Sequence, residues 1–216
     1  LTDCRTAELS KLVENSFRDV NIAFANELSL ICDKLSINVW KLIELANHHP
    51  RVNILQPGPG VGGHCIAVDP WFIVDSAPDE AKLIRAARLV NDNKPNFVLG
   101  KIDKAVKAIG KNKSDLKIAC LGLSYKPDID DLRESPALSI AGKIGLMGFS
   151  ELFLVEPNIF SIPDKLKGES ISITSADKAI KAADIVVLLV DHTPFKKMDL
   201  EVLSGKQIVD TRGIWS

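Results

Sequence analysis

A hydrophobic repeat of helical period constrains the fold of this chain more than any other feature of its sequence. Apolar residues recur at steps of three and four between Thr6 and Lys34, which places them on one face of a single helix. At about 1.5 Å per residue this helix is roughly 40 Å long, more than a small domain needs. We therefore expect it to form the core of a homodimer. The apolar positions are Leu9, Leu12, Val13, Phe17, Val20, Phe24, Leu28 and Ile31.

Two further helical stretches follow. Asn38 is suited to cap a helix over 39–47, which ends before the next proline. A third stretch begins near Pro78 and keeps the helical period beyond residue 90. The pattern leaves open whether this helix breaks at Pro95 or continues to Ile109.

The pattern changes at Leu116, where apolar runs begin to alternate with helical segments. Such alternation implies a parallel sheet with right-handed crossovers. The expected fold class is α/β: an all-helical, dimerising domain over residues 1–110 and a small Rossmann-like, parallel-sheet domain over residues 111–216. The strands are predicted over 116–125, 151–155, 184–190 and 207–211, and the helices over 135–147 and 175–183.

Composition excludes several classes of function. With 46% hydrophobic and 25% charged residues among 216, the chain can bury a proper core. The net charge is −1 and no basic stripe with interleaved aromatics occurs, so no nucleic-acid partner is expected. No apolar run is long enough to span a bilayer, so no membrane partner is expected either. The four cysteines show no C-x-x-C spacing, which fits a reducing, cytoplasmic setting.

The segment PGPGVGGHC, over 57–65, contains the letters of a G-x-G-x-x-G motif. A dinucleotide fingerprint needs a strand before it and a helix opened by its last glycine. Here the preceding segment is short, and Pro70 is expected to break any helix that follows. The alternative places the function on Cys65, with the glycines letting a substrate approach its sulfur. A tight turn with an inert cysteine stays open as a third interpretation.

Potential metal ligands cluster near this segment, at His48, His49, His64, Cys65 and Asp69. His64 and Cys65 are adjacent in sequence, and adjacent side chains rarely converge on one tetrahedral ion. No zinc-binding spacing supports a site. We therefore expect no metal.

Donor side chains lie on one face of the first helix. Lys11, Asn15 and Arg18 stand at positions i, i+4 and i+7, a strip suited to an anionic ligand. An ordinary solvated face is the alternative. Asp69, four residues after Cys65, could activate water or orient Lys11, or it could simply be a turn residue ahead of a proline.

Three long segments of the chain resemble the UDP-glucose/GDP-mannose dehydrogenase family, the nucleotide-sugar 6-dehydrogenases. They are AELSKLVENSFRDVNIAFANELSLIC (7–32), HPRVNILQPGPGVGGHCIAVDPWFIV (49–74) and YKPDIDDLRESPA (125–137). The family's amino-terminal NAD-binding domain is absent, and the chain starts with Leu1 rather than Met. We therefore expect a fragment that holds the central helical domain and the nucleotide-sugar (UDP)-binding domain.

The resemblance implies a four-electron, NAD-dependent oxidation of the sugar C6 alcohol to a uronate, in the synthesis of cell-surface polysaccharide precursors. Cys65 would be the nucleophile, through a thiohemiacetal and a thioester. UDP-N-acetylmannosamine is the favoured substrate, with UDP-glucose and UDP-N-acetylglucosamine as alternatives. NAD would be bound mainly by the missing domain, so the fragment alone is expected to be inactive.

Two other functions remain open. The fragment could be a non-catalytic module that binds UDP-sugars and dimerises. It could also be a thiol hydrolase or transferase that uses Cys65 with a nearby histidine. A hydrolase predicts His64 or His49 within hydrogen-bond reach of the thiol, whereas a dehydrogenase predicts Lys11 and Asn15 there.

The resemblance also assigns roles to individual residues. Lys11 would stabilise oxyanions, Asn15 would hold a water or the sugar O6, and Asp69 would activate water. Arg133 and Arg212 would reach the cofactor or the diphosphate, although an ion pair of Arg133 with Asp130 or Asp131 is the alternative. The substrate-binding residues would be Arg18, His49, Arg51, Gly62, Tyr125 and Lys126.

Glu156 ends the second predicted strand, where dinucleotide-binding domains carry their ribose carboxylate. The first strand, however, is followed by Leu123-Ser124-Tyr125-Lys126 instead of a glycine-rich turn. We therefore expect a Rossmann-like domain without a pyrophosphate loop.

Overall fold

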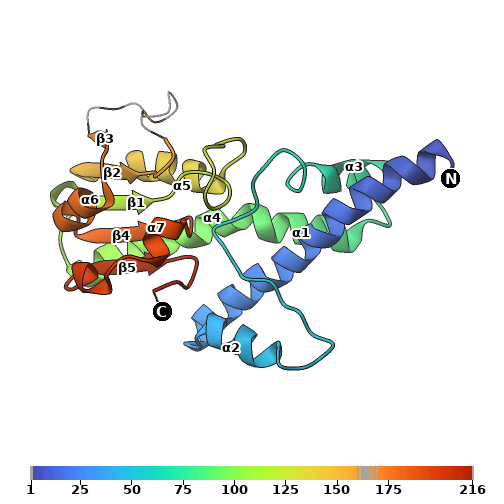
Figure 1. Ribbon diagram of the computed structural model, residues 1–216, viewed down its shortest axis with the longest axis horizontal. Helices are drawn as coiled ribbons and strands as arrows, with labels where there is room; N and C mark the ends of the chain where they lie inside the picture. Colours follow the sequence, from blue (N-terminus) through green and yellow to red (C-terminus); the bar gives the residue numbers. More distant parts are fainter. Residues whose placement is uncertain (1, 160, 162–165, 167, 169, 216) are drawn as a thin grey trace. The chain divides into compact units, whose positions relative to one another are not determined.

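The computed structural model describes residues 2–159, 161, 166, 168 and 170–215 (Figure 1). The chain forms two compact units, residues 1–94 (unit 1) and 95–216 (unit 2), which divide inside helix α4, Lys82–Ile109. The division into domains at residue 110 stays a prediction, because compactness alone does not define what folds independently. The described residues contain no helix long and apolar enough to cross a membrane.

Unit 1 is built on the long helix that the sequence predicts. Helix α1 spans Cys4–Leu35 and begins where the Asp3 side chain accepts a hydrogen bond from the N–H of Thr6. Helix α2, Val39–Ala46, is capped by Asn38, as predicted. The α4 helix continues through Pro95, so the break that the proline could have caused does not occur.

Helix α3, Asp69–Ser76, corrects one sequence prediction. Pro70 does not prevent a helix, because it lies in the first turn of α3. In a first turn the missing proline N–H has no intrahelical partner to lose, and the fixed φ of proline suits the helix. The helix nevertheless starts six positions after the last glycine of the motif, so that glycine does not open it.

Buried polar side chains join α1 to α4 within unit 1. Nη1 of Arg88 donates to Oδ1 of Asp19 over 2.6 Å, and Nδ2 of Asn91 donates to the same oxygen over 2.8 Å. Asn26, further along α1, donates to Oδ1 of Asn91 over 2.9 Å. All four side chains are buried. Helix contact in unit 1 therefore rests on polar pairing as well as on apolar packing.

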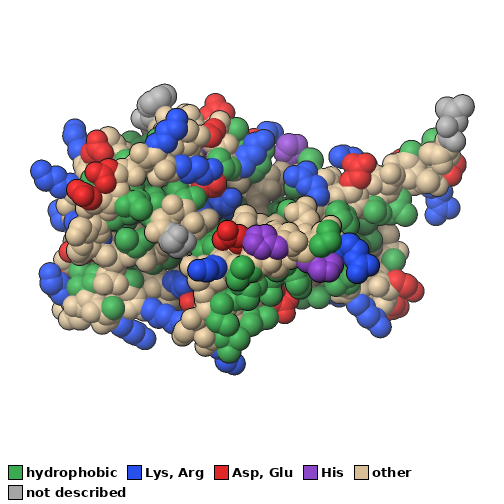
Figure 2. Space-filling view, turned by 60° about the horizontal axis from the view of Figure 1, so that its bottom comes forward, with side chains coloured by type: hydrophobic (Ala, Val, Ile, Leu, Met, Phe, Trp, Pro, Cys, Tyr) green, Lys and Arg blue, Asp and Glu red, His purple; other side chains and the backbone are tan. Residues whose placement is uncertain are grey.

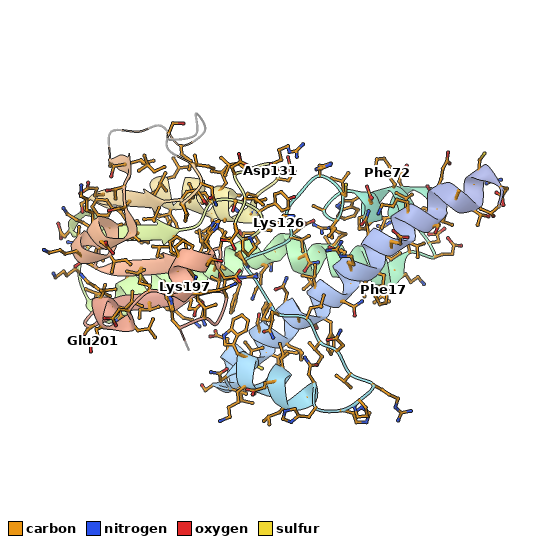
Figure 3. The ribbon with its side chains drawn as sticks, in the orientation of Figure 1. Phe17, Phe72, Lys126, Asp131, Lys197 and Glu201 are labelled. Atoms are coloured by element: carbon orange, nitrogen blue, oxygen red, sulfur yellow. The ribbon has the colours of Figure 1, made fainter. Side chains whose placement is uncertain are left out.

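Apolar side chains also remain exposed on α1. Phe17 is 69% exposed, and it projects from α1 as Phe72, 56% exposed, projects from α3 (Figure 3). Figure 2 shows hydrophobic side chains at the surface of the molecule, next to charged ones. The exposed apolar residues of α1 are Leu9, Val13, Phe17, Phe24, Ile31 and Leu35. Exposed apolar side chains gathered on one helix face are typical of contact surfaces.

Unit 2 is a five-stranded parallel sheet of order β3-β2-β1-β4-β5, with helices on its faces (Figure 1). This confirms the Rossmann-like α/β fold. The strands are β1 Lys117–Leu121, β2 Glu151–Val155, β3 Ile171–Ile173, β4 Ile185–Leu188 and β5 Gln207–Asp210. The helices are α5 Pro136–Gly145, α6 Ala176–Ala182 and α7 Thr193–Lys196, with short 3-10 turns at Lys113–Asp115 and Leu200–Leu203. Strand β3 and helix α7 are absent from the sequence prediction.

The core of unit 2 has one apolar cluster on each face of the sheet. In β1, Ile118 and Cys120 belong to one cluster, whereas Ala119 and Leu121 belong to the other. This alternation follows from the two-residue period of a strand. Residues of α4 after Pro95 and residues of α5 complete the first cluster, and residues of α6 with Phe195 complete the second. Burial raises the pKa of the Cys120 thiol, so this cysteine is an apolar core residue.

The chain leaves β1 at Gly122, which has a φ of +90°. A Cβ at this position would lie 2.4 Å from Cβ of Val190 and 2.8 Å from its backbone nitrogen. Only glycine fits this close approach. It directs the chain into the β1–α5 loop (residues 122–135), at the carboxyl edge of the sheet. The loop ends at Ser135, which caps α5 by accepting a hydrogen bond from the N–H of Leu138.

Candidate functional site

One contact in unit 1 joins two of the predicted catalytic residues. Nδ2 of Asn15, buried on α1, donates to Oδ2 of Asp69 over 2.6 Å, although the two are 54 positions apart in sequence. Asp69 is the first residue of α3, where a carboxylate is favoured by the helix dipole. The Asn15 amide and the Asp69 carboxylate therefore form a fixed donor and acceptor pair, with the amide as the donor.

Cys65 lies in the turn that leads into α3. Its carbonyl oxygen accepts hydrogen bonds from the N–H groups of Val68 over 3.0 Å and of Asp69 over 2.8 Å. The residue is partly exposed and its thiol is free. Cys65 thus precedes the carboxylate by one helical turn, and the same backbone that opens α3 holds both residues.

The glycine segment before Cys65 is attached to α1 by a buried side chain. Oδ1 of Asn26 accepts a hydrogen bond of 2.9 Å from the N–H of Gly58. Further along, Gly60 and Gly63 have φ values of 148° and 82°, which favour glycine. The glycines therefore shape a turn that is fixed to α1 and ends at Cys65. The interpretation that the glycines serve the cysteine stays a prediction.

The other members of the donor strip point to solvent. Lys11 pairs with Glu14 over 3.1 Å, with both side chains about two-thirds exposed at 67% and 65%. Arg18 is exposed as well. Of the three residues, only Asn15 is turned into the unit to meet Asp69. The catalytic role of Lys11 and the sugar contact of Arg18 stay predictions.

A thiol hydrolase would place His64 or His49 within hydrogen-bond reach of Cys65. His64 is exposed, and Nδ1 of His49 accepts the N–H of Arg51 over 3.3 Å. Among the described residues, no three His, Cys, Asp or Glu residues converge as metal ligands. Gly62 is partly exposed in the same turn as Cys65. The substrate contacts of His49, Arg51 and Gly62 stay predictions.

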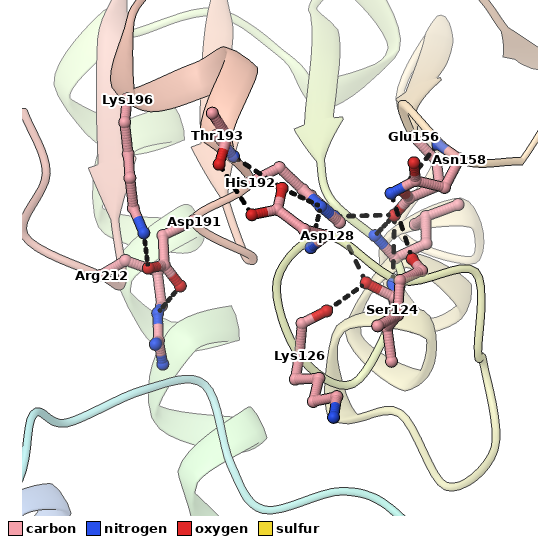
Figure 4. Close-up of polar contacts among 12 residues, drawn as sticks. Ser124, Lys126, Asp128, Glu156, Asn158, Asp191, His192, Thr193, Lys196 and Arg212 are labelled. Carbon is pink, nitrogen blue, oxygen red and sulfur yellow. Dashed lines mark hydrogen bonds and ion pairs between the residues drawn. The ribbon is translucent and has the colours of Figure 1, made fainter.

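In unit 2 the predicted ligand residues lie on the β1–α5 loop. Tyr125 and Lys126 follow β1, and Nζ of Lys126 stands 5.8 Å from the centre of the Tyr125 ring. Lys126 is exposed, and its carbonyl oxygen accepts a hydrogen bond of 2.8 Å from Oγ of Ser124 (Figure 4). Figure 3 shows Lys126 and Asp131 on this loop. A cation and an aromatic ring are thus presented at the carboxyl edge of the sheet, where such sheets bind ligands.

Both predicted cofactor-binding arginines are paired with carboxylates. Arg133 meets Asp131 through Nε, over 3.0 Å to both oxygens, and through Nη2 over 2.6 Å. This is the ion pair that the sequence offered as the alternative to a cofactor contact. Nε of Arg212 meets Asp191 over 2.8 Å. The cofactor contacts of both arginines stay predictions.

Asp191, which follows β4, is shared between Arg212, which follows β5, and Lys196, the last residue of α7. Its second oxygen pairs with Lys196 over 2.7 Å. Burial opposes ionisation of Asp191, but Arg212 and Lys196 outweigh it and lower the pKa of the carboxyl group.

Glu156, at the end of β2, is turned into unit 2 and is buried. Its Oε2 accepts the N–H of Leu123 over 2.7 Å and the N–H of Ser124 over 3.2 Å, and it lies 3.1 Å from Nε2 of His192. Burial opposes ionisation, but the hydrogen bonds from His192 and the backbone outweigh it and lower the pKa of Glu156. The carboxylate therefore organises the loop instead of facing a ribose.

His192 and Asp128 are not among the residues that the sequence predicts for the site. His192 directly follows the apolar run DIVVLLVD, so it stands at the carboxyl end of a predicted strand. Polar residues at that edge are candidates for a site, and this signal could have singled it out.

Both units match known families of proteins. Residues 5–93 match the UDP-glucose/GDP-mannose dehydrogenase family, central domain, and residues 119–216 match the UDP binding domain of the same family. The chain belongs to the UDP-glucose/GDP-mannose dehydrogenase family.

Individual relatives resemble the chain over its whole length. It is 58% identical over 219 residues to the UDP-N-acetyl-D-mannosamine dehydrogenase of Salmonella typhi, covering 100% of this chain and 52% of the relative. It is 56% identical over 216 residues to the NDP-N-acetyl-D-galactosaminuronic acid dehydrogenase of Ralstonia solanacearum, covering 100% and 50%. The chain thus spans about half the length of the curated relatives it matches.

Solved structures also match nearly the whole of this chain and about half of their own length. The UDP-D-ManNAc dehydrogenase of Pyrococcus horikoshii matches with a TM-score of 0.86 and 39% identity, over 99% of this chain and 50% of that one. The native UDP-N-acetyl-mannosamine dehydrogenase of Staphylococcus aureus matches with a TM-score of 0.78 and 42% identity, over 99% and 48%.

Proposed function

We propose that this chain carries the nucleophile and the nucleotide-sugar site of a UDP-N-acetylhexosamine 6-dehydrogenase, which oxidises the sugar C6 alcohol to a carboxylate. The observation that carries the proposal is the 2.6 Å hydrogen bond between Asn15 and Asp69. It holds an amide and a carboxylate together, with Cys65 one turn ahead on the same backbone. Covalent chemistry at a carbonyl carbon needs a nucleophile, a base and an oxyanion donor of this kind.

Each of these residues has a proposed role. The Cys65 thiolate adds to the aldehyde carbon C6, and the thiohemiacetal keeps the half-oxidised sugar bound. At the thioester level Asp69 takes a proton from water as the water oxygen attacks C6. The C–S bond then breaks, which releases the uronate and restores the thiolate. Asn15 fixes Asp69 and offers an N–H to O6, and Lys11 stabilises the oxyanion.

Hydride removal from C6 needs an acceptor, and the family resemblance implies NAD. Unit 2 does not fit this dinucleotide in the usual way, because Gly122 is followed by Leu123 and Ser124 instead of further glycines. The carboxylate of Glu156 also faces His192 inside the unit. We therefore assign no dinucleotide to unit 2 and derive no step through it.

The proposed substrate is UDP-N-acetylmannosamine, with UDP-glucose and UDP-N-acetylglucosamine as alternatives. Support comes from the names of the relatives, which act on N-acetylated nucleotide sugars. The product would be a uronate for cell-surface polysaccharide precursors, made in the cytoplasm. Unit 2 would hold the UDP moiety through Tyr125 and Lys126, and unit 1 would hold the sugar through residues such as Arg18.

The 216-residue chain by itself is proposed to be a binding and dimerisation module. The exposed apolar face of α1, with Phe17 at 69% and Leu35 at 60% exposure, supports a homodimer through this helix. Light scattering tests this part directly. A mass of one chain at high micromolar concentration would rule the dimer out, and Phe17→Glu should shift the mass towards one chain.

Calorimetry with the 216-residue chain tests the nucleotide-sugar site. UDP, UDP-glucose, UDP-N-acetylglucosamine and UDP-N-acetylmannosamine are titrated in turn. We expect all four to bind and UDP-N-acetylmannosamine to bind most tightly. No heat of binding with any of them would contradict the proposal, and another order of affinities would change the substrate.

The nucleophile is tested in a chimaera with the amino-terminal half of the Salmonella typhi relative. Cys65→Ser should reduce uronate formation by on the order of 10³ or more, because serine is a far poorer nucleophile without a paired base. Cys4→Ser is the matched control, since Cys4 is also free and is exposed. Uronate formation unchanged by Cys65→Ser would eliminate the proposed mechanism.

A further inference from the structure

His192 is a fully buried histidine that the proposed chemistry does not use. It lies at the end of β4 with an exposed fraction of 0%, and its ring packs edge-on against Phe195 with centroids 5.5 Å apart. Three polar groups surround the ring, one from the end of β2 and two from the β1–α5 loop (Figure 4). A buried imidazole with partners from both segments is placed to fix the loop relative to the sheet.

The backbone sets the tautomer of this ring. The N–H of Asp128 donates to Nδ1 of His192 over 2.9 Å. Since a backbone N–H is only a donor, Nδ1 carries no proton and Nε2 carries it. Nε2 then donates to Oε2 of Glu156 over 3.1 Å, and Oγ of Ser124 lies 3.3 Å from the same nitrogen. Glu156 therefore holds the ring in the state that can accept the N–H of Asp128.

This group is not a catalytic triad, although it contains a serine, a histidine and a carboxylate. In a triad the carboxylate and the hydroxyl meet opposite nitrogens of the ring. Here Glu156 and Ser124 share Nε2, and Ser124 is fully buried. Oγ of Ser124 is moreover directed to the carbonyl oxygen of Lys126. The arrangement is suited to holding a loop and not to attacking a substrate.

The residue held by His192 has a strained backbone. Asp128 has a φ of +60°, and Glu134 in the same loop has a φ of +49°. A non-glycine residue keeps such a conformation only when its surroundings impose it. Besides His192, Thr193 fixes Asp128: its N–H donates to Oδ1 over 2.9 Å and its hydroxyl to Oδ2 over 2.7 Å. Tyr125 and Lys126 lie three and two positions before this fixed residue.

We propose that Glu156 and His192 form a positioning pair that holds the β1–α5 loop, through the N–H of Asp128, in the conformation that presents Tyr125 and Lys126 to a nucleoside diphosphate. The inference rests on the proposed nucleotide-sugar site of unit 2. Neither member of the pair touches the ligand. Glu156 accepts a hydrogen bond from one side of the ring, the other side of the ring fixes the N–H of Asp128, and Asp128 fixes the loop.

Two substitutions at His192 test the two ring nitrogens separately. His192→Asn keeps an acceptor where Nδ1 stood, so it retains the bond to Asp128 and loses the one to Glu156. His192→Gln keeps a donor where Nε2 stood, so it retains the bond to Glu156 and loses the one to Asp128. Both remove the ring, and both are expected to lower the temperature of unfolding to a similar degree.

The readouts are hydrogen exchange of the β1–α5 loop and the affinity for UDP by calorimetry, both with the 216-residue chain. In His192→Gln we expect faster exchange over residues 124–133 and UDP binding weaker by about tenfold, the effect of one unsatisfied buried donor. In His192→Asn we expect the loop to stay protected and the affinity to fall by less than about threefold.

The matched control is Ser150→Ala. It removes a hydrogen bond of 2.8 Å from Oγ of Ser150 to the carbonyl oxygen of Leu116, near the amino end of β2. It should lower the unfolding temperature and leave UDP affinity unchanged.

Equal effects of the two His192 variants on exchange and on affinity would overturn the inference, because a purely structural role cannot distinguish the two ring nitrogens. If wild-type chain does not bind UDP, the proposed nucleotide-sugar site fails, and the exchange measurement still decides whether His192 anchors the loop.

Discussion

Each unit has a buried carboxylate at the centre of a polar network, but the two carboxylates are stabilised in different ways. Glu156 of unit 2 accepts three backbone N–H groups, from Leu123, Ser124 and Asn158, and a fourth bond from His192. Asp19 of unit 1 accepts from the side chains of Arg88 and Asn91 through one oxygen. Within the described residues, Oδ2 of Asp19 and Nε of Arg88 have no hydrogen-bond partner.

The pKa shifts of the two groups run in opposite directions. Burial raises the pKa of Asp19, and the charge of Arg88 and the hydrogen bond from Asn91 offset this only in part. Burial opposes ionisation of Glu156 too, but His192 and the backbone donors outweigh it and lower the pKa. Donors spread over both oxygens therefore lower the pKa of a buried carboxyl group more than a cation and an amide that share one oxygen do.

The largest effect is expected from breaking the ion pair of unit 1. Arg88→Met leaves Asp19 buried without its cation and should lower the free energy of unfolding by about 3–5 kcal/mol. Urea denaturation at neutral pH measures this loss. Arg85→Met, on the exposed side of the same helix, is the control and should change stability by less than about 0.5 kcal/mol. A small loss in Arg88→Met would mean that Asp19 is already neutral in the folded chain.

A smaller effect is expected where the network of unit 1 meets the glycine segment. Asn26→Ala leaves the N–H of Gly58 and Oδ1 of Asn91 without a partner, which should lower the free energy of unfolding by about 2 kcal/mol. Asn21→Ala is matched, because Asn21 lies on the same helix and its side chain donates to the carbonyl oxygen of Phe17, one turn earlier. In the chimaera, Asn26→Ala should also slow uronate formation. If Asn26→Ala lowers the free energy of unfolding but leaves the rate of uronate formation unchanged, the polar network of unit 1 does not position Cys65.

The smallest effect is expected at Glu156, and it depends on pH. Because its pKa in the folded chain lies below the ordinary value of 4.5, the carboxylate stabilises the fold above about pH 4.5. That contribution disappears as the pH falls through the lowered pKa. Glu156→Gln should cost about 1–2 kcal/mol at pH 7 and should flatten the acid limb of a plot of unfolding free energy against pH.

The control for this prediction is Glu151→Gln, at the other end of β2. Its ion pair with Lys117 is partly exposed, with side chains 45% and 34% exposed, so less than about 1 kcal/mol is expected. An acid limb that stays as steep in Glu156→Gln as in the wild type would show that other groups cause it.

Sequence patterns predicted most of the secondary structure because long apolar repeats carry the signal. Helix α1 and strand β2 follow directly from periodicity, and Ser135 caps α5 as its sequence suggests. Strand β3 was missed because three residues are too few to establish a period. The sequence does not predict helix α3, because a proline usually breaks a helix. Pro70 stands in the first turn of α3, where a proline is tolerated.

The candidate site was harder to predict because its contacts join distant positions. Nothing local to Asn15 indicates that its partner is Asp69, 54 positions away. The role of Glu156 depends on His192, 36 positions further along. The family resemblance identifies the β1–α5 loop as a binding segment but does not identify the residues that hold the loop in place. Periodicity identifies the faces of helices and strands, whereas pairings across the fold emerge only from its topology.

The turn at Gly122 has a consequence for how this sequence can change. A replacement there must overcome both a φ of +90° and a clash with Val190. Shortening the side chain of Val190 does not open the space, because its backbone nitrogen is also within 2.8 Å of the added Cβ. No compensating substitution at either position can restore the fit. In a saturation library scored for folding, every substitution of Gly122 should therefore be depleted. Second substitutions at neighbouring positions should not restore folding.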